Sequence, residues 1–312
     1  MQDIIQRIKS NDHLALSRII SKVENEESIP DSFFIDIHPD TLTPIRLGIT
    51  GPPGVGKSTL TECLISKILK DGLSVGVVAI DPTSPFTNGS VLGDRIRVNR
   101  YYNDEDVFIR SVPSRDSTGG LSYNISEISD VLESASFDVI IYETVGVGQV
   151  EIDIVKEVDS VILTLVPESG DDIQMMKAGI LEIADIYVIN KYDRKDSDRL
   201  YRSLKNMLSI NQKKYLESKW KPLILKTVAT KDEGVEALFD SLNVHRNYID
   251  NYANASKYEI RYKNKIRKLL ADYFNDQFWT KEKKDELDKE LNKDYLSQQS
   301  PYKFLDKLLK NE

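Results

Sequence analysis

The segment Gly51-Pro-Pro-Gly-Val-Gly-Lys57-Ser58-Thr59 decides how the rest of the sequence is interpreted, because it matches the phosphate-binding pattern G-x-x-x-x-G-K-[ST]. A short apolar run precedes it, and a stretch with apolar residues at helical spacing follows it. In a strand–turn–helix setting, the backbone N–H groups of such a segment surround phosphate oxygens at the amino end of the helix. The nucleotide contacts we expect here are Gly51, Pro52, Pro53, Gly54, Val55, Gly56, Lys57, Ser58 and Thr59.

The pattern around this segment predicts an α/β fold with a mostly parallel central sheet flanked by helices, as in P-loop nucleotide hydrolases. Short runs that are apolar on both faces alternate with amphipathic stretches, as expected for buried parallel strands. The runs are Ile45–Thr50, Val75–Ile80, Val107–Arg110, Val139–Tyr142, Val161–Val166, Ile186–Ile189 and Leu223–Val228. Ligands of such sheets bind at the carboxyl ends of the strands, so we expect the functional residues there.

The sequence predicts three parts. Residues 1–42 form a helical N-terminal extension that packs on the main domain, and residues 43–253 form the nucleotide-binding domain. Residues 254–312 are Lys-rich and helical in pattern, without a catalytic constellation, and we expect a C-terminal extension for dimerisation or packing.

A second motif, Asn190-Lys191-Tyr192-Asp193, follows the run Ile186–Ile189 and matches N-K-x-D, which selects guanine. The Asp193 carboxylate can accept two hydrogen bonds, from the ring N–H and the exocyclic amine of guanine. Adenine has neither donor, so the motif favours GTP over ATP. We expect Lys191 over the plane of the base and Asn190 as a brace between loops. The segment Thr227–Thr230 follows the last apolar run, and Val228, Ala229 and Thr230 within it are expected to contact the guanine oxygen through their backbone.

A third stretch, Phe137–Gln149, is an apolar run that ends in the carboxylate of Glu143 and continues into a glycine-rich turn. Gly146 in this turn is expected to contact the terminal phosphate of the nucleotide. Magnesium binds oxygen ligands and keeps several waters, so Ser58, Asp81, Asp94 and Glu143 are the expected metal residues. Lys57, Glu143 and Asp94 are the expected catalytic residues, because phosphoryl transfer needs positioning and charge neutralisation more than covalent chemistry. Neither Gln149 nor Gln174 can be assigned as the residue that positions water. Slow intrinsic turnover, accelerated by a partner, is therefore expected.

The bulk composition limits the class of protein. A net charge of −8 argues against a nucleic-acid-binding surface as the main function. The single cysteine, Cys63, cannot form an internal disulfide, and its place on the expected helix favours a packed core residue. No apolar run reaches the length of a membrane span, and the first residues do not form a signal peptide, so a cytoplasmic location is expected.

Over nearly its whole length the sequence resembles the methylmalonyl-CoA mutase-associated GTPases, a family of P-loop GTPases also called ArgK-type or LAO/AO transport ATPases. The resemblance includes the two nucleotide motifs and, most specifically, the run Glu143-Thr-Val-Gly-Val-Gly-Gln149. The further matching segments are Leu14–Asn25, Asp81–Ser90, Leu92–Arg97, Ile109–Arg115 and Gly119-Gly120. Asn88 and the residues Asp116-Ser-Thr before Gly119 depart from the family's pattern and leave the details of the first switch open.

The resemblance implies a GTP-hydrolysing chaperone for an adenosylcobalamin-dependent acyl-CoA mutase, which gates cofactor loading and protects the mutase. It further implies a homodimer, with Mg²⁺ and GTP or GDP bound. Asp81–Arg97 and Glu143–Asp153 would form the first and second switches. Pro167–Lys177 would touch the mutase, and the expected switch and partner residues are Gln149, Asp171 and Lys177.

Two alternatives from other classes stay open. A metallochaperone GTPase of the nickel type needs soft ligands, and the sequence offers only three scattered histidines and one cysteine. A kinase or ATPase linked to lysine, arginine and ornithine transport would transfer phosphate to a protein and prefer ATP.

Overall fold

The apolar runs form one seven-stranded sheet in the order β3-β2-β4-β1-β5-β6-β7, and every neighbouring pair is parallel. The computed structural model describes residues 2–25, 27, 29–38, 44–81, 99–101, 104–113, 124–144, 146, 154–170, 180–210, 215–217 and 219–310. The strands are β1 (Ile45–Thr50), β2 (Val75–Asp81), β3 (Val107–Pro113), β4 (Val139–Glu143), β5 (Ser160–Leu165), β6 (Ile186–Ile189) and β7 (Leu223–Lys226). The predicted fold class is thus confirmed.

The last strand ends earlier than the sequence suggested. β7 stops at Lys226, and Val228 instead forms an isolated antiparallel bridge with Glu233. The chain then returns to the end of the strand at Gly234 (φ 75°), the residue before the next helix, where a Cβ would lie 2.0 Å from the carbonyl oxygen of Lys226. The early end of β7 places residues 228–231 above the carboxyl edge of the sheet.

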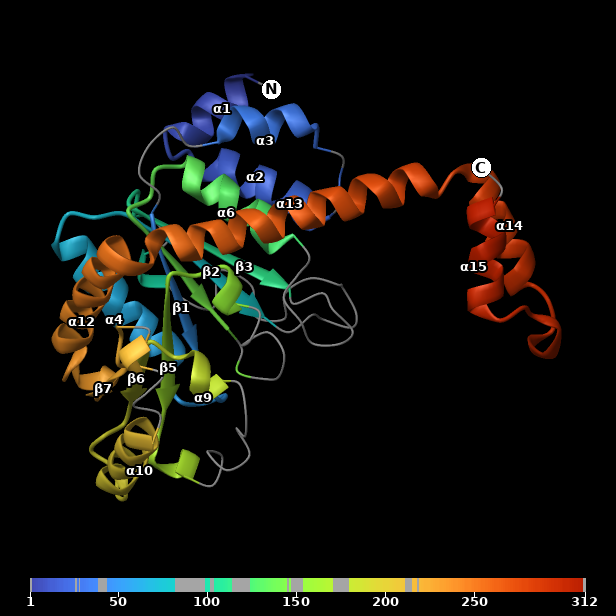
Figure 1. Cartoon of the computed structure of the whole chain (residues 1–312). Helices are drawn as coiled ribbons and strands as arrows, with labels where there is room; N and C mark the ends of the chain where they lie inside the picture. Colours follow the sequence, from blue (N-terminus) through green and yellow to red (C-terminus); the bar gives the residue numbers. More distant parts are fainter. Residues whose placement is uncertain are drawn as a thin grey trace. The chain divides into compact units, whose positions relative to one another are not determined.

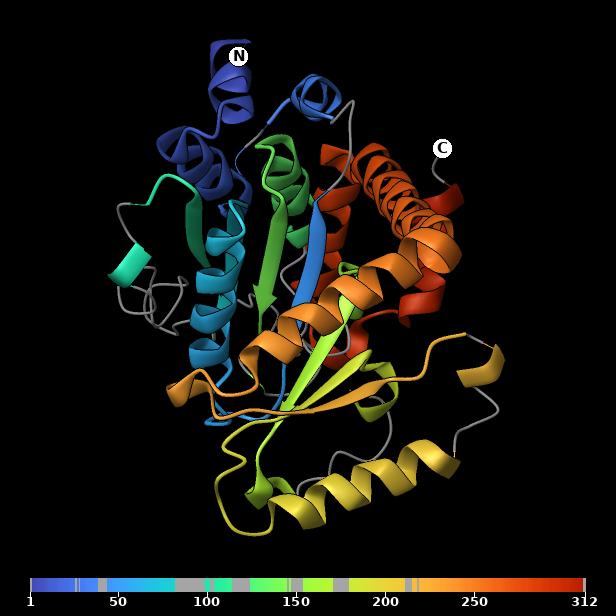
Figure 2. The same cartoon turned by 90° about the vertical axis from the view of Figure 1, so that its left-hand side faces the viewer.

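Helices cover both faces of the sheet, and alternate residues of β2 and β4 supply the cores on the two faces. On one face Val78, Ile80 and Tyr142 pack with the N-terminal helices and α6. These helices are α1 (Gln2–Lys9), α2 (His13–Glu24), α3 (Asp31–Ile37) and α6 (Ile125–Ser134), grouped beside one another in Figures 1 and 2. Asp12 caps α2 by accepting hydrogen bonds from the backbone N–H groups of Leu14 and Ala15. The N-terminal segment therefore shares the main core.

On the opposite face Ile49, Val77 and Ile141 pack against α4 and α12. These helices are α4 (Lys57–Lys70) and α12 (Val235–Tyr248), which lie side by side in both views (Figures 1 and 2). Cys63 on α4 is half-buried and packs against this core. Next to β5 and β6, a smaller core includes Leu200, Leu204 and Leu208 of α10 (Ser197–Ile210), and α9 (Ile180–Ile183) precedes β6.

The chain divides into two compact units, Met1–Lys257 and Tyr258–Glu312. The second unit comprises most of α13 (Asn254–Phe278), then α14 (Lys281–Leu291) and α15 (Pro301–Lys310). Its buried apolar residues are Phe304 and Leu308, whereas many large apolar side chains of the unit are exposed. None of the helices in the described part of the chain is long and apolar enough to span a membrane. The short helical turns are η1 (Asn99–Tyr101), η2 (Ile154–Lys156), η3 (Pro167–Gly170), η4 (Ala229–Lys231), η5 (Ile249–Ala253) and η6 (Tyr295–Ser297).

Candidate functional site

The predicted phosphate loop connects β1 to α4 at the carboxyl edge of the sheet, and it requires glycine at its first position. Gly51 has φ 140°, and a Cβ there would lie 2.0 Å from the carbonyl oxygen of Thr164 in β5. Neither the backbone conformation nor the available space allows a side chain. The loop then passes through residues 52–56 to Lys57, where α4 begins and directs the N–H groups of its first turn toward the loop.

Lys57 lies inside this loop. Its side chain is buried, and Nζ donates hydrogen bonds to the carbonyl oxygens of Gly51 (2.7 Å) and Pro52 (2.9 Å). A buried ammonium group can exchange such neutral carbonyl acceptors for an anion, because a charge-assisted bond to phosphate is stronger.

Gly146, after β4, comes into direct contact with this loop. A Cβ at Gly146 would lie 2.2 Å from the carbonyl oxygen of Gly51 and 2.8 Å from Nζ of Lys57. Its φ of 99° also excludes most side chains. Gly146 therefore lies closer to the backbone of Gly51 than any residue other than glycine would permit.

Glu143, the last residue of β4, is buried and bonds to the first turn of α4. Ser58 Oγ donates to Glu143 Oε1 (2.5 Å), and Thr61 Oγ1 lies 3.0 Å from Glu143 Oε2. Asp81 is fully buried at the end of β2 and lies two residues beyond Ala79, the register partner of Glu143. These groups offer only oxygen donors, the ligand type that Mg²⁺ prefers. The residues present therefore fit a magnesium ion.

Asn190, directly after β6, connects three segments of the candidate site. Its Nδ2 donates to the carbonyl oxygen of Val55 in the phosphate loop (2.9 Å). Its Oδ1 accepts from the backbone N–H of Ala229 and from Thr227 Oγ1, each at 3.1 Å. The buried amide of Asn190 thereby fixes the phosphate loop relative to the segment that follows β7.

The rest of the N-K-x-D motif is more exposed. Lys191 has φ 55°, and its Nζ donates to the carbonyl oxygen of Gly54 (2.7 Å). The Asp193 carboxylate forms an ion pair with Lys231 Nζ at 3.1 Å. Val228, Ala229 and Thr230 form the turn between β7 and α12, next to Asn190.

The structure thus brings together four of the predicted groups: residues 51–59, Glu143 with Gly146, residues 190–193 and residues 228–230. Asp94, Gln149, Asp171 and Lys177 lie outside the described residues, as do the further candidate Gln174 and most of the expected switches. Sequence reasoning missed Thr61 and Lys231, and it singled out the segment Thr227–Thr230 without the contact between the Thr227 hydroxyl and Asn190. Thr61 could have been found from its position one turn after Lys57, whereas Lys231 carries no periodic signal.

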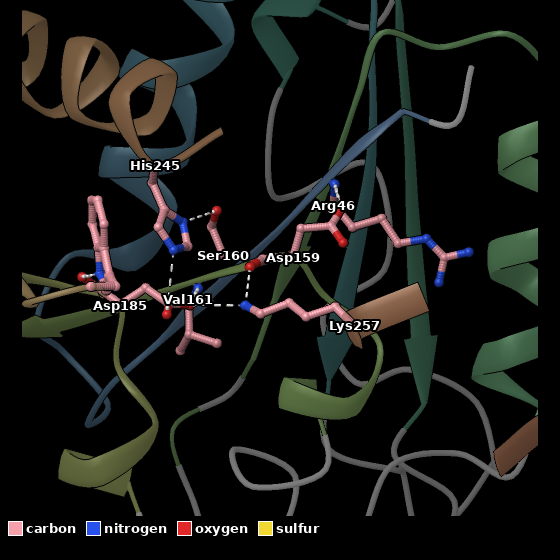
Figure 3. Close-up of polar contacts among 8 residues, drawn as sticks. Arg46, Asp159, Ser160, Val161, Asp185, His245 and Lys257 are labelled. Carbon is pink, nitrogen blue, oxygen red and sulfur yellow. Dashed lines mark hydrogen bonds and ion pairs between the residues drawn. The ribbon is translucent and has the colours of Figure 1, made fainter. Parts of the chain in front are cut away.

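A second buried polar cluster lies at the opposite, amino edge of the sheet, where β5 and β6 begin (Figure 3). His245 Nδ1 lies 2.6 Å from Ser160 Oγ, and Nε2 lies 3.5 Å from Asp185 Oδ1. Lys257 Nζ bonds to the Asp159 carbonyl oxygen and lies 3.5 Å from Asp185 Oδ2. Burial lowers the pKa of His245 to about 4. A serine–histidine–aspartate set can be nucleophilic, but Ser160 and His245 are buried here, away from any substrate. This cluster connects the amino ends of β5 and β6 to α12.

The parallel sheet, the glycine loop and the buried lysine define the chain as a P-loop nucleotide-binding protein. Residues 16–283 match the family described as Methylmalonyl Co-A mutase-associated GTPase MeaB, and the chain belongs to this family. Fold and family make it a GTPase, an enzyme that hydrolyses GTP to GDP and phosphate, as the sequence predicted.

Known relatives agree with this assignment. The chain is 42% identical to a putative GTPase of Pyrococcus abyssi, over 99% of this chain and 96% of the relative. It is 35% identical to the GTPase ArgK of Escherichia coli, over 78% of this chain and 75% of the relative. A crystal structure of an LAO/AO transport system kinase superimposes with a TM-score of 0.69 at 26% identity, covering 99% of this chain and 96% of that one.

Proposed function

We propose that this GTPase is a chaperone for an adenosylcobalamin-dependent acyl-CoA mutase, and that its bound guanine nucleotide gates the loading of the mutase cofactor and protects the mutase. The family description, which names a mutase, supports the choice of client. The observation that carries the nucleotide part is the Asn190 amide, which ties the phosphate loop at Val55 to Ala229. One ligand can therefore contact both segments at once.

In this proposal the nucleotide lies along the carboxyl edge of the sheet. The backbone of residues 51–59 binds the phosphates, and Lys57 exchanges the carbonyl oxygens of Gly51 and Pro52 for phosphate oxygens. Asp193 accepts the two N–H donors of guanine, and Lys191 covers the base. Val228, Ala229 and Thr230 approach the guanine oxygen through their backbone.

Ser58 and Glu143 would hold Mg²⁺, together with Asp81 and Asp94 through water. The ion would supply neutralisation of phosphate charge and orientation of the phosphate oxygens. Glu143 accepts the Ser58 hydroxyl hydrogen bond and so fixes the direction of that oxygen. Lys57, inside the loop, balances the negative charge that develops as the terminal phosphate leaves.

Gly146 connects the nucleotide site to the second switch, through which the partner would respond to the bound nucleotide. Because it touches both Gly51 and Lys57, a change in the position of Lys57 acts directly on the start of the second switch. A nucleotide can shift the equilibrium between two switch conformations only if its contacts differ between them, and a contact that depends on Lys57 can differ in this way. Residues Gln149, Asp171 and Lys177 would carry the nucleotide state to the mutase.

A homodimer completes the proposal. The second unit exposes a large set of apolar side chains and buries few, so a second copy of the chain is a suitable cover. The exposed residues are Tyr258, Ile260, Tyr262, Ile266, Leu269, Leu270, Tyr273, Phe274, Leu291, Tyr295, Leu296, Tyr302, Leu305 and Leu309. Light scattering should give twice the chain mass, whereas a monomer for both the wild type and Phe274→Asp would contradict the dimer.

Pull-down tests the client. The tagged protein, loaded with GDP or with a non-hydrolysable GTP analogue, is mixed with a recombinant methylmalonyl-CoA mutase. We expect retention that differs between the two nucleotide states and is lost in Lys57→Ala. Equal retention in both states, or retention that Lys57→Ala leaves intact, would remove the support for nucleotide gating.

The base assignment has its own test. Asp193→Asn should shift binding from guanosine toward xanthosine diphosphate, because an amide matches the oxygen that xanthine has in place of the exocyclic amine of guanine. Unchanged preference for GDP in this variant would mean that the base motif is misassigned.

A further inference from the structure

We infer that Lys231 is a positioning residue for the guanine-reading carboxylate of Asp193, and that it determines how strongly the site distinguishes guanine from hypoxanthine. The inference rests on the proposed nucleotide site and adds a residue to it. The N-K-x-D motif does not include Lys231, which lies 38 residues away from Asp193 in the sequence.

The contact between the two side chains is direct. Lys231 Nζ donates to Asp193 Oδ2 at 3.1 Å. Among the residues that the structure describes, Lys231 is the side chain that forms an ion pair with this carboxylate. About half of each side chain is exposed, 54% for Lys231 and 45% for Asp193, so both are accessible to a ligand that enters from solvent.

The backbone on the lysine side is held by hydrogen bonds. The N–H of Lys231 donates to the carbonyl oxygen of Val228 (2.9 Å), within the turn η4. The N–H of Asp232 donates to the carbonyl oxygen of Ala229 (3.2 Å), and Val228 pairs with Glu233 across the turn. A lysine stem is flexible, but its starting point here is fixed relative to β7.

The backbone on the aspartate side is fixed to the same turn. The N–H of Tyr192 donates to the carbonyl oxygen of Thr227 (3.0 Å), and Asn190 Oδ1 accepts from Ala229. The ion pair between Asp193 and Lys231 is therefore an additional link between two loops that backbone and amide bonds already hold together. Because both backbone segments are already fixed, forming the ion pair costs only the entropy of the two side chains, and the pair can then orient the carboxylate.

The acceptor capacity of the carboxylate allows Lys231 and guanine to bind together. An ionised carboxylate has about four lone-pair sites, and Lys231 occupies one of them on Oδ2. Guanine needs one site on each oxygen, for its ring N–H and its exocyclic amine. The hydrogen bond from Lys231 also lowers the pKa of Asp193, which keeps the group an acceptor of both hydrogens.

Removal of the Lys231 side chain should therefore weaken the recognition of the exocyclic amine of guanine by Asp193. The terminal torsion of an aspartate is broad, so a carboxylate without a fixed partner presents both oxygens to the base for less of the time. Hypoxanthine lacks the exocyclic amine and depends on one oxygen only. Loss of Lys231 should thus cost guanine more affinity than hypoxanthine, whereas a general loss of structure would weaken both equally.

The experiment measures the ratio of the dissociation constants of inosine diphosphate and GDP by calorimetry, in the presence of Mg²⁺. Because both ligands are measured on one preparation, the ratio does not depend on the active fraction. Ion pairs that are open to solvent are weak, so we expect Lys231→Ala to lower the ratio only about two- to fivefold. Lys231→Arg should keep most of the wild-type ratio, because it retains a donor.

Lys293→Ala is the matched control, since Lys293 also forms a lysine–carboxylate ion pair, with Glu290 at 2.7 Å, but belongs to the second unit. It should keep the wild-type ratio. A wild-type ratio in Lys231→Ala, or an equal fall in Lys293→Ala, would overturn the role of Lys231 while leaving the GDP site standing. Absence of GDP binding in the wild type would instead overturn the proposed nucleotide site and this inference together.

Discussion

Replacement of His245 by glutamine should remove a pH-dependent part of the free energy of unfolding. His245 is fully buried, with Ser160 Oγ at 2.6 Å from Nδ1 and Asp185 Oδ1 at 3.5 Å from Nε2. The pKa of His245 is lowered from 6.5 to about 4; burial is the largest cause, and the nearby Lys257 acts in the same direction. The carboxylates of Asp185 and Asp159 act in the opposite direction but do not compensate.

The direction of the pH dependence follows from the number of protons that His245 binds in the folded and in the unfolded state. Between pH 6.5 and about 4 the unfolded chain protonates His245, whereas the folded chain keeps it neutral. The stability that His245 contributes is therefore complete above pH 6.5 and is lost as the pH falls toward 4. A change from 6.5 to about 4 corresponds to about 3 kcal/mol, at about 1.4 kcal/mol per pKa unit.

Urea unfolding of the wild type and His245→Gln, at pH values from about 4 to about 7.5, checks this magnitude. The difference in unfolding free energy between the two proteins should shrink by about 3 kcal/mol across the window as the pH falls. His38→Gln, at an exposed histidine, should follow the wild type throughout. A difference between the wild type and His245→Gln that does not change with pH would contradict a lowered pKa of His245.

Three further predictions concern the nucleotide site. Gly51→Ala should abolish GDP binding in calorimetry, because the added Cβ meets a carbonyl oxygen at 2.0 Å. Gly72→Ala also places alanine at a positive φ, of 71°, but it lies outside the phosphate loop with open space around it, and this variant should still bind GDP. Asn190→Ala should lower the free energy of unfolding by about 2–4 kcal/mol in urea, since it leaves three buried partners unpaired; an unchanged value would contradict its bridging role. Glu143→Gln should bind GDP but hydrolyse GTP at least about tenfold more slowly in a phosphate-release assay; wild-type turnover would exclude Glu143 from catalysis.

The sequence predicted the sheet well because buried parallel strands leave a strong local pattern. Val139–Tyr142 and Ile186–Ile189, for example, are apolar on both faces and became β4 and β6. The order of the strands was not predictable in the same way. β1 lies between β4 and β5, and nothing in the run Ile45–Thr50 specifies these neighbours, because similar apolar strands can pair with one another equally well.

The site was predictable to the extent that its chemistry lies in short motifs. Lys57 and Asn190 stand at fixed positions in such motifs, and the structure places both at the carboxyl edge of the sheet. Contacts between distant residues left no local signal. The pairs Asp193–Lys231 and Ser160–His245 are 38 and 85 residues apart, and an isolated lysine or histidine has no periodicity that reveals its partner.

One guanine nucleotide should bind where β1, β4 and β6 end. Calorimetry with GDP and with ADP on the magnesium-supplied, nucleotide-free protein measures this binding. We expect one GDP per chain and no detectable heat with ADP, with GDP binding lost in Lys57→Ala. Equal binding of ADP, or no heat with GDP, would contradict it.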